Sequence, residues 1–137
     1  MMLRTDLARA ALALALAAAM PAAVHGHEEA AGPEGLDWHL TSYGDSDRTV
    51  PVPWYVDATL RLEDGTARGA AGCNDLMAQY ALDGDRLSLD SVGHTEISCT
   101  GDVMAVEDGY LAALPEVAAW AMDTSGATGE RRLLLYD

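Results

Sequence analysis

Two cysteines, Cys73 and Cys99, are the residues whose chemistry the sequence constrains most. A pair of thiols can form a disulfide, act in redox catalysis or bind a metal ion. Redox catalysis typically uses closely spaced cysteines such as C-x-x-C, which this spacing lacks. A metal site could add His94, but no fourth ligand is evident. The N-terminus indicates an exported chain, and two cysteines in an exported chain favour a disulfide. We therefore predict a Cys73–Cys99 disulfide that contributes roughly 3–4 kcal/mol to the stability of the fold.

Glu107 is the polar residue that is best placed for acid–base chemistry. It lies four residues after Val103 and four before Leu111, on a helix face that we expect to be buried. A buried carboxylate must be paired or protonated. One interpretation is a structural role, with Arg68 or backbone donors as partners. The other is a catalytic or ligand-binding group, which would need a cleft and a second catalytic residue that the sequence does not identify.

The other candidates are histidines and aromatic residues. His39 and His94 are lone histidines on predicted strands, and we interpret them as surface or internally paired residues. His27 lies at the predicted cleavage point, where a new amino terminus could chelate copper, although a disordered tail is the simpler interpretation. Trp54 and Tyr55 follow a proline-rich loop, and they are either core or rim aromatics or an exposed contact surface.

Length, charge and missing motifs exclude several functions. The chain has 137 residues, enough for one domain, and a formal net charge of −14. That charge argues against nucleic acid and anionic membranes as partners, because both are bound through Lys and Arg. No Gly-rich phosphate loop, nucleophile elbow or metalloprotease motif occurs in the sequence. We therefore expect no cofactor, no metal and no catalytic activity.

The first 26 residues have the pattern of a secretory signal peptide. Arg4 and Arg9 form a basic start, Ala10–Ala19 is an unbroken Ala/Leu run, and small residues follow. The run of about ten residues is shorter than the about 20 that a membrane-spanning helix needs. A bacterial lipid anchor requires a cysteine at the cleavage point, and the sequence has no cysteine there, so we expect no lipid anchor. We predict a periplasmic or secreted protein without stable membrane insertion, in which residues 1–26 are removed and residues 27–35 form a flexible tail.

The segments that must position these side chains alternate as β-strands do. Residues 36–41 and 56–62 place apolar side chains on one face, and Ser42–Pro53 between them has the composition of a loop. Asp-Gly at 64–65 predicts a hairpin turn. Further strands are predicted at 67–72, 77–82, 86–90, 92–98, 117–122 and 131–136, with a second tight turn at 83–85.

One segment has helical periodicity. Apolar residues from Asp102 to Leu114 recur at spacings of three and four, Thr100 or Asp102 can cap the first turn, and Pro115 ends the helix. About eight short strands and one helix indicate the α+β class. We predict a single compact domain over residues 36–137, in which a curved antiparallel sheet, a half-barrel, packs around the helix.

Several motifs in a fixed order resemble the META domain family, which includes the bacterial heat-shock protein HslJ. The matching positions are Gly69, Gly72, Cys73, Asn74, Tyr80, Thr95, Cys99, Met104, Glu107, Tyr110 and Leu114, followed by a closing Leu-x-Leu strand. The resemblance covers about residues 36–137. It implies an exported protein with a compact mixed β fold and a link to heat shock and antibiotic tolerance, but it carries no biochemical mechanism.

These observations support three hypotheses of function. The first is a monomeric, non-enzymatic, META/HslJ-like protein that acts in the envelope stress response by binding an envelope protein or a small ligand. The second is a secreted acidic inhibitor of a basic enzyme such as lysozyme, because charge complementarity speeds encounter. The third is a weak hydrolase that uses Glu107.

Overall fold

The computed structural model of the protein describes residues 1–4, 32–45, 47–126 and 128–137. Its helices are α1 (Gly101–Ala113) and the 3₁₀ turn η1 (Leu114–Glu116). Its strands are β1 (Met2–Arg4), β2 (Asp37–Asp45), β3 (Arg48–Pro51), β4 (Thr59–Glu63), β5 (Thr66–Ala70), β6 (Asp75–Asp83), β7 (Arg86–His94), β8 (Ala119–Asp123) and β9 (Arg132–Tyr136). Within the described residues, no helix has the length and apolar character needed to cross a bilayer.

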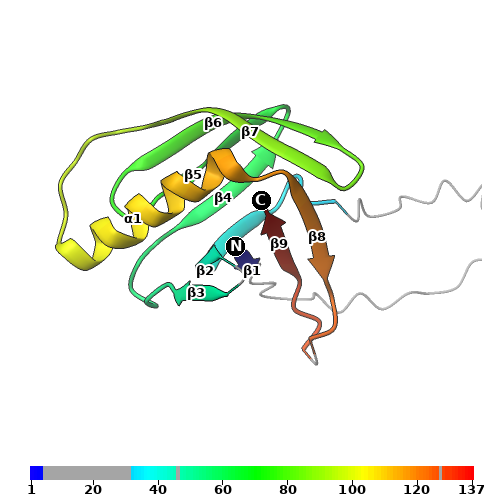
Figure 1. The fold of residues 1–137 in the computed structure, drawn as a ribbon, viewed down its shortest axis with the longest axis horizontal. Helices are drawn as coiled ribbons and strands as arrows, with labels where there is room; N and C mark the ends of the chain where they lie inside the picture. The colour runs from blue at the N-terminus through cyan, green and yellow to red at the C-terminus, as the bar shows by residue number, and fades with distance from the viewer. Residues whose placement is uncertain (5–31, 46, 127) are drawn as a thin grey trace, which may run out of the picture.

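The strands form a closed antiparallel barrel, which corrects the predicted half-barrel. The strand order is β1-β9-β8-β7-β6-β5-β4-β2-β3, and β1 also pairs with β2, so that eight strands make a ring and β3 lies outside it (Figure 1). The closure was not foreseen because Met2–Arg4 had the pattern of a signal-peptide start. Instead, these residues lie between β2 and β9 and are paired to both.

The N-terminal boundary is partly described. The predicted signal peptide and tail fall mostly on residues 5–31, which lie outside the described residues. Within the described part of the predicted tail, Pro33 is fully buried, and its carbonyl accepts a hydrogen bond from the Trp38 indole at 2.8 Å. Gly35 donates its backbone N–H to Leu62 at 2.8 Å.

The first half of the barrel follows the predicted alternation. Trp38 and Leu40 of β2, and Leu60 and Leu62 of β4, are buried in one core. The tight turn between β4 and β5 is confirmed, because Asp64 and Gly65 have φ angles of 51° and 79°, the left-handed values that an Asp-Gly hairpin turn requires.

Two boundaries in this half differ from the prediction. The 42–53 segment is not a loop throughout, because β2 continues to Asp45 and pairs with β3, with Tyr43 opposite Val50. All four residues of β3 are exposed, so this hairpin has backbone pairing without an apolar face to signal it. β4 begins at Thr59 rather than residue 56, because the backbone N–H of Val56 turns back to the Pro53 carbonyl.

The strands predicted at 86–90 and 92–98 are one strand, β7, which has an irregularity and ends at His94, so that residues 95–98 are not a strand. The β6–β7 register shifts between Met77 and Gln79, and Ser91 has a positive φ of 55°. A β-bulge of this kind adds a residue to one strand and breaks the alternation, which explains the apparent gap in the sequence pattern.

The helix was predicted within a residue of its observed bounds. It contributes Val106 and Tyr110 to the core, and Leu114 of η1 is fully buried beside them. In Figure 1, α1 crosses the β4 and β5 region, and the contacts described below tie it to β4 and to the β5–β6 connection. This position brings Glu107 against residues 73 and 74.

Candidate functional site

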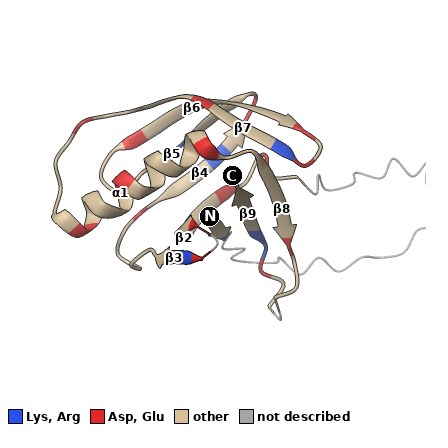
Figure 2. Ribbon diagram, in the orientation of Figure 1, with Lys and Arg blue, Asp and Glu red and all other residues tan. Residues whose placement is uncertain are grey.

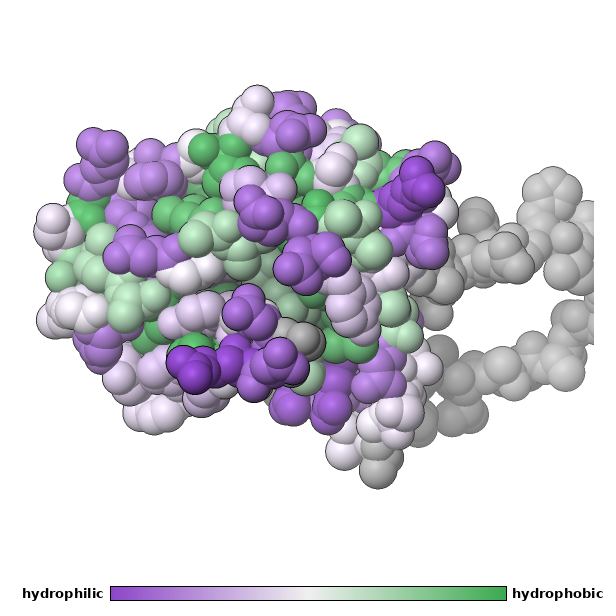
Figure 3. Space-filling model, in the orientation of Figure 1, coloured by the Kyte–Doolittle hydropathy of each residue, from purple (hydrophilic) through white to green (hydrophobic). Residues whose placement is uncertain are grey.

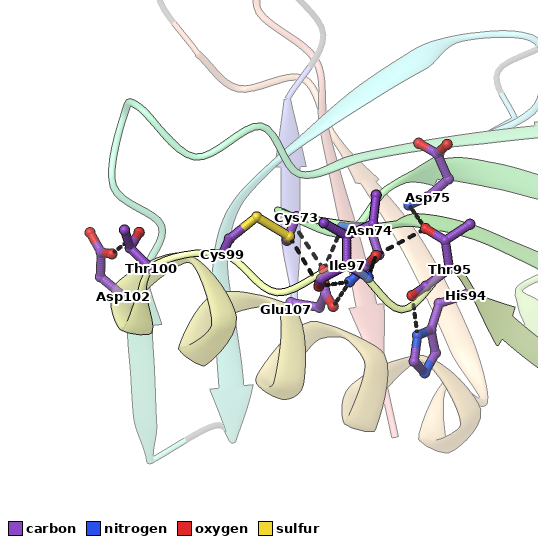
Figure 4. The surroundings of a disulfide bond; sticks show 10 residues. All are labelled: Cys73, Asn74, Asp75, His94, Thr95, Ile97, Cys99, Thr100, Asp102 and Glu107. Carbon is purple, nitrogen blue, oxygen red and sulfur yellow. Dashed lines mark hydrogen bonds between the residues drawn. A yellow bond between two sulfur atoms is a disulfide. The ribbon is translucent and has the colours of Figure 1, made fainter.

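The two cysteines are bonded in the structure, with the sulfur atoms 2.03 Å and the Cα atoms 5.9 Å apart. Cys73 lies in the connection between β5 and β6, and Cys99 lies two residues before α1. Figure 4 shows the bond joining the start of the helix to this connection. The disulfide therefore fixes one end of α1 against the barrel wall.

Glu107 lies at the centre of a hydrogen-bond network that we call the carboxylate latch: Glu107, Cys73 and Asn74. Its Oε2 atom accepts the backbone N–H groups of Cys73 at 3.0 Å and Asn74 at 2.6 Å. Its Oε1 atom accepts the side-chain amide of Asn74 at 2.6 Å. Glu107 is 2% exposed, so these bonds replace the water that the carboxylate has lost. The partners are backbone and amide donors, and not Arg68.

Asn74 extends the latch to the segment before the helix. Its side-chain oxygen accepts the backbone N–H of Ile97 at 2.6 Å and the hydroxyl of Thr95 at 3.0 Å. Its amide nitrogen donates to the carbonyl of Ile97 at 2.9 Å as well as to Glu107. Every polar atom of this side chain is therefore used. Asn74 thus holds residues 95–97 and α1 together (Figure 4).

The latch keeps Glu107 ionised. Burial alone would raise the pKa of this carboxyl, but the hydrogen bonds from Asn74 and Cys73 favour the charged form more strongly, and His94 adds a smaller favourable charge effect. The net effect is a pKa below the ordinary value of a glutamate. A carboxyl that acts as a general acid near neutral pH needs a raised pKa, which burial without hydrogen-bond partners would produce.

The start of the helix is held differently from the prediction. Thr100 is the N-cap residue, but its side chain makes no capping bond to the helix backbone. Its hydroxyl instead donates to the Asp102 carboxylate at 2.8 Å, and the Tyr55 hydroxyl donates to the same carboxylate at 2.7 Å. These two bonds lower the pKa of Asp102, with the bond from Tyr55 having the largest effect. Asp102 thereby connects the 54–55 loop to α1.

Other residues of the resembling motifs are placed in the core and around it. Tyr110 is fully buried, and its hydroxyl donates to the Thr59 carbonyl at 2.9 Å. Burial raises the pKa of this phenol. Tyr80 donates its hydroxyl to Glu34, and burial is the main cause that raises the pKa of Tyr80. These bonds tie α1 to β4 and β6 to the N-terminal segment.

The two motif glycines stand where the chain is crowded or turned. A Cβ atom on Gly69 would overlap the carbonyl oxygen of Thr59 on the neighbouring strand. Gly72 has a φ of 118°, a left-handed value that favours glycine, and its Cα faces the helix at Val103. Both glycines therefore let backbone segments approach closely next to the disulfide.

A cavity of about 330 Å³ lies beside the latch, between α1 and residues 94–98. It is lined by Asn74, His94, Met104, Glu107, Leu111 and neighbouring residues of the 96–98 segment. His94 is exposed there, with its Nδ1 atom 2.8 Å from the Thr95 carbonyl. Among the described residues, no group of three or more His, Cys, Asp or Glu side chains is arranged to hold a metal ion.

The predicted contact pair lies on the surface. Trp54 is 94% exposed and Tyr55 is 55% exposed, and their rings meet edge to face with centroids 5.7 Å apart. They are therefore not core aromatics. His39, the other lone histidine, is also exposed, on β2.

Sequence reasoning assigned no contact to three residues that build this region. Ile97 supplies both backbone bonds to Asn74, and Thr59 receives the Tyr110 hydroxyl. Tyr43 lies across α1, where its ring fills the space that a side chain on Gly109 would need. Of these contacts, only the one at Gly109 had a usable signal in the sequence. Glycine inside a helix costs stability, so its presence there indicates that another group packs where a side chain would lie.

Comparisons with known proteins agree with this geometry. A family model described as META domain matches residues 34–137. Among solved structures, the chain is similar to a protein from Burkholderia xenovorans determined by NMR, with a TM-score of 0.60 and 24% sequence identity. That similarity covers 74% of this chain and 81% of the other chain, and it concerns the fold alone. No curated protein matches the chain.

Proposed function

The chain belongs to the META domain family, and on that premise we propose that it is an exported, HslJ-like binding protein of the envelope stress response that catalyses no reaction. Its proposed role is tolerance to heat and antibiotics. Its proposed partner is an envelope protein or a small ligand.

Export is supported by the disulfide and by the N-terminal sequence. Disulfides form and persist in oxidising compartments such as the bacterial periplasm. The Cys73–Cys99 bond joins two segments that the carboxylate latch also holds together, so the disulfide stabilises the folded domain. The basic and Ala/Leu-rich start of the chain has the composition of a secretory signal.

The use of Glu107 is the observation that carries the non-enzymatic part of the proposal. This residue was the best candidate in the sequence for acid–base chemistry, yet its two oxygens accept hydrogen bonds from residues 73 and 74. Its lowered pKa opposes a role as general acid, and the three hydrogen bonds that it accepts stabilise the carboxylate and so weaken it as a base. Glu107 is thus explained by folding, and binding is left as the proposed activity.

The exposed aromatic pair Trp54 and Tyr55 is the proposed contact surface. Aromatic side chains are enriched in protein interfaces, and Trp and Tyr are among the residues most often found at energetic hot spots. Asp102 fixes the Tyr55 hydroxyl, so this loop is ordered before a partner arrives. On the face shown in Figure 3, hydrophilic and apolar residues are interspersed.

A deletion strain tests this proposal. We expect the strain to lose growth under heat and under antibiotics, and the wild-type gene to restore it. The Trp54→Ala variant should fail to restore growth, whereas Met77→Ala, which removes another exposed apolar side chain from β6, should restore it. Unchanged growth of the deletion strain under both stresses would contradict the stress role, and full rescue by Trp54→Ala would contradict the surface.

Charge favours a second candidate, an inhibitor of a basic enzyme such as lysozyme. The chain carries 22 acidic and eight basic residues. Figure 2 shows acidic residues on α1, at strand ends and in loops. Complementary charge accelerates encounter at low ionic strength. Lysozyme activity measured with and without the protein, at low and high salt, decides this candidate, and full lysozyme activity at low salt eliminates it.

A further inference from the structure

The barrel is closed by a strand of three residues, β1, which is bound on both sides. Leu3 stands opposite Leu40 of β2 and opposite Leu133 of β9, antiparallel to each (Figure 1). Met1 exchanges two backbone hydrogen bonds of 2.9 Å with Leu135, and Thr41 donates its hydroxyl to the Met2 carbonyl at 3.0 Å. Within the described residues, β2 and β9 do not pair with each other, so β1 alone joins them.

The side chains of β1 occupy defined positions. Leu3 is 0% exposed and belongs to the hydrophobic core. Arg4 lies at the rim, with its guanidinium 3.4 Å from the Glu130 carboxylate. The gap between residues 39–42 of β2 and 132–135 of β9, which we call the strand slot, therefore receives one large aliphatic side chain followed by one basic side chain.

The strand that fills the slot is part of the segment predicted to be removed on export. Cleavage near residue 26 would leave β2 and β9 with unpaired backbone N–H and C=O groups along the slot. It would also leave a hole in the core where Leu3 was packed. Both changes favour binding of a new strand with the same chemistry.

We propose that the strand slot is a peptide-binding site, which in the exported protein takes an extended aliphatic–basic segment of another polypeptide by strand addition. The inference rests on the export that the proposed function includes, but it concerns a different surface from Trp54 and Tyr55. Backbone hydrogen bonds to β2 and β9 supply affinity, and the positions of Leu3 and Arg4 supply specificity.

Charge selects a basic segment as the occupant. Glu130 faces the position of Arg4, and the whole chain has a formal net charge of −14. Arg132 of β9 also stands opposite Arg4, but its guanidinium lies 3.9 Å from the Asp123 carboxylate, which offsets its charge. An acidic segment would bring a like charge next to Glu130 and would be repelled by the rest of the protein. A segment without a large aliphatic residue would leave the core hole unfilled.

The first measurement is the N-terminus of the protein purified from the periplasm of an expressing bacterium, determined by mass spectrometry. We expect a chain that begins near His27. A protein that retains Met1–Arg4 would overturn the inference, because its slot is already filled by its own β1.

The second measurement is binding of the synthetic peptide Met-Met-Leu-Arg-Thr to that exported protein, followed by NMR. We expect saturable binding, with amide shifts concentrated in residues 39–42 and 132–135. The peptide Met-Met-Asn-Arg-Thr has the same charge and should bind at least about tenfold more weakly, because it cannot fill the aliphatic position. Equal binding of both peptides, or no binding, overturns the slot even if the N-terminus lies near His27.

A protein variant tests the basic position. Glu130→Gln should weaken binding of Met-Met-Leu-Arg-Thr by about two- to fivefold at low salt, because it removes the carboxylate that faces the arginine. Glu96→Gln, an exposed glutamate after β7 and across the barrel, should leave the affinity unchanged. Two other outcomes would contradict the inference. One is a dimer of the exported protein that pairs through the slot, and the other is an NMR spectrum in which the protein's own N-terminal tail already occupies the slot.

Discussion

The Glu107 carboxylate accepts two hydrogen bonds of 2.6 Å from Asn74, one from its backbone nitrogen and one from its side-chain amide. Because Asn74 also binds both polar backbone groups of Ile97, this pair joins the helix, the β5–β6 connection and the 95–97 segment. The disulfide joins Cys73 of the β5–β6 connection to Cys99, which lies between the 95–97 segment and the helix. The region is therefore held twice, by a covalent bond and by a buried polar network.

Glu107→Gln should destabilise the domain by about 1.5–3 kcal/mol. The variant keeps the shape of the side chain but turns one acceptor oxygen into an NH₂ group. That group would face the Asn74 amide, also a donor, and Asn74 cannot reverse its amide without losing its bonds to Thr95 and Ile97. Urea unfolding measures the loss. Asp108→Asn, on the exposed side of the same helix turn, is the control and should be nearly neutral.

The stabilisation by Glu107 should depend on pH in one direction. Its pKa is below 4.5, the ordinary value, so its contribution is present above pH 4.5 and is lost as the pH falls through the folded-state pKa. The difference in unfolding free energy between wild type and Glu107→Gln should thus be constant near neutral pH and shrink in acid. Taking the difference removes the effects of Glu63, Asp102 and Asp123, whose pKa values are also lowered. A difference that grows in acid would refute this.

Loss of the disulfide should cost roughly 3–4 kcal/mol by the chain-entropy model, because the bond spans 26 positions. The double variant Cys73→Ser, Cys99→Ser is compared with wild type by urea unfolding, with and without a reducing agent. We expect the reducing agent to lower the stability of wild type toward that of the double variant and to leave the double variant unchanged. Equal stability of the oxidised wild type and the double variant would contradict the structural role.

Gly69→Ala should destabilise the domain by about 1–3 kcal/mol, because the added Cβ would overlap the Thr59 carbonyl oxygen and push β4 and β5 apart. Gly93→Ala, on β7, is the matched control. The nearest atom to its added Cβ is the Met77 carbonyl oxygen at 3.9 Å, which is an ordinary contact. Thermal unfolding of both variants measures the contrast, and equal midpoints would show that the close approach at Gly69 has no energetic weight.

The features predicted from sequence are those with a local signal. Apolar residues at every second position, Trp38 and Leu40 in one strand and Leu60 and Leu62 in the next, marked the buried face of the first strands. Asp64-Gly65 marked the turn between β4 and β5, and the spacing of Val106 and Tyr110 marked the helix. The boundaries failed where the signal was weak, as in β3, which buries no residue, and at Ser91, where a bulge interrupts the strand.

The sequence by itself determined the helix, most of the strands, the pairing of the only two cysteines and the resemblance to the META domain family, because composition, periodicity and ordered motifs carry these features. Only the tertiary structure decided that the barrel closes through Met2–Arg4, and that Glu107 binds Asn74 and Cys73 rather than Arg68. Both depend on contacts between distant segments, and a hydrogen-bond donor 33 or 34 positions away leaves no periodic mark in the chain.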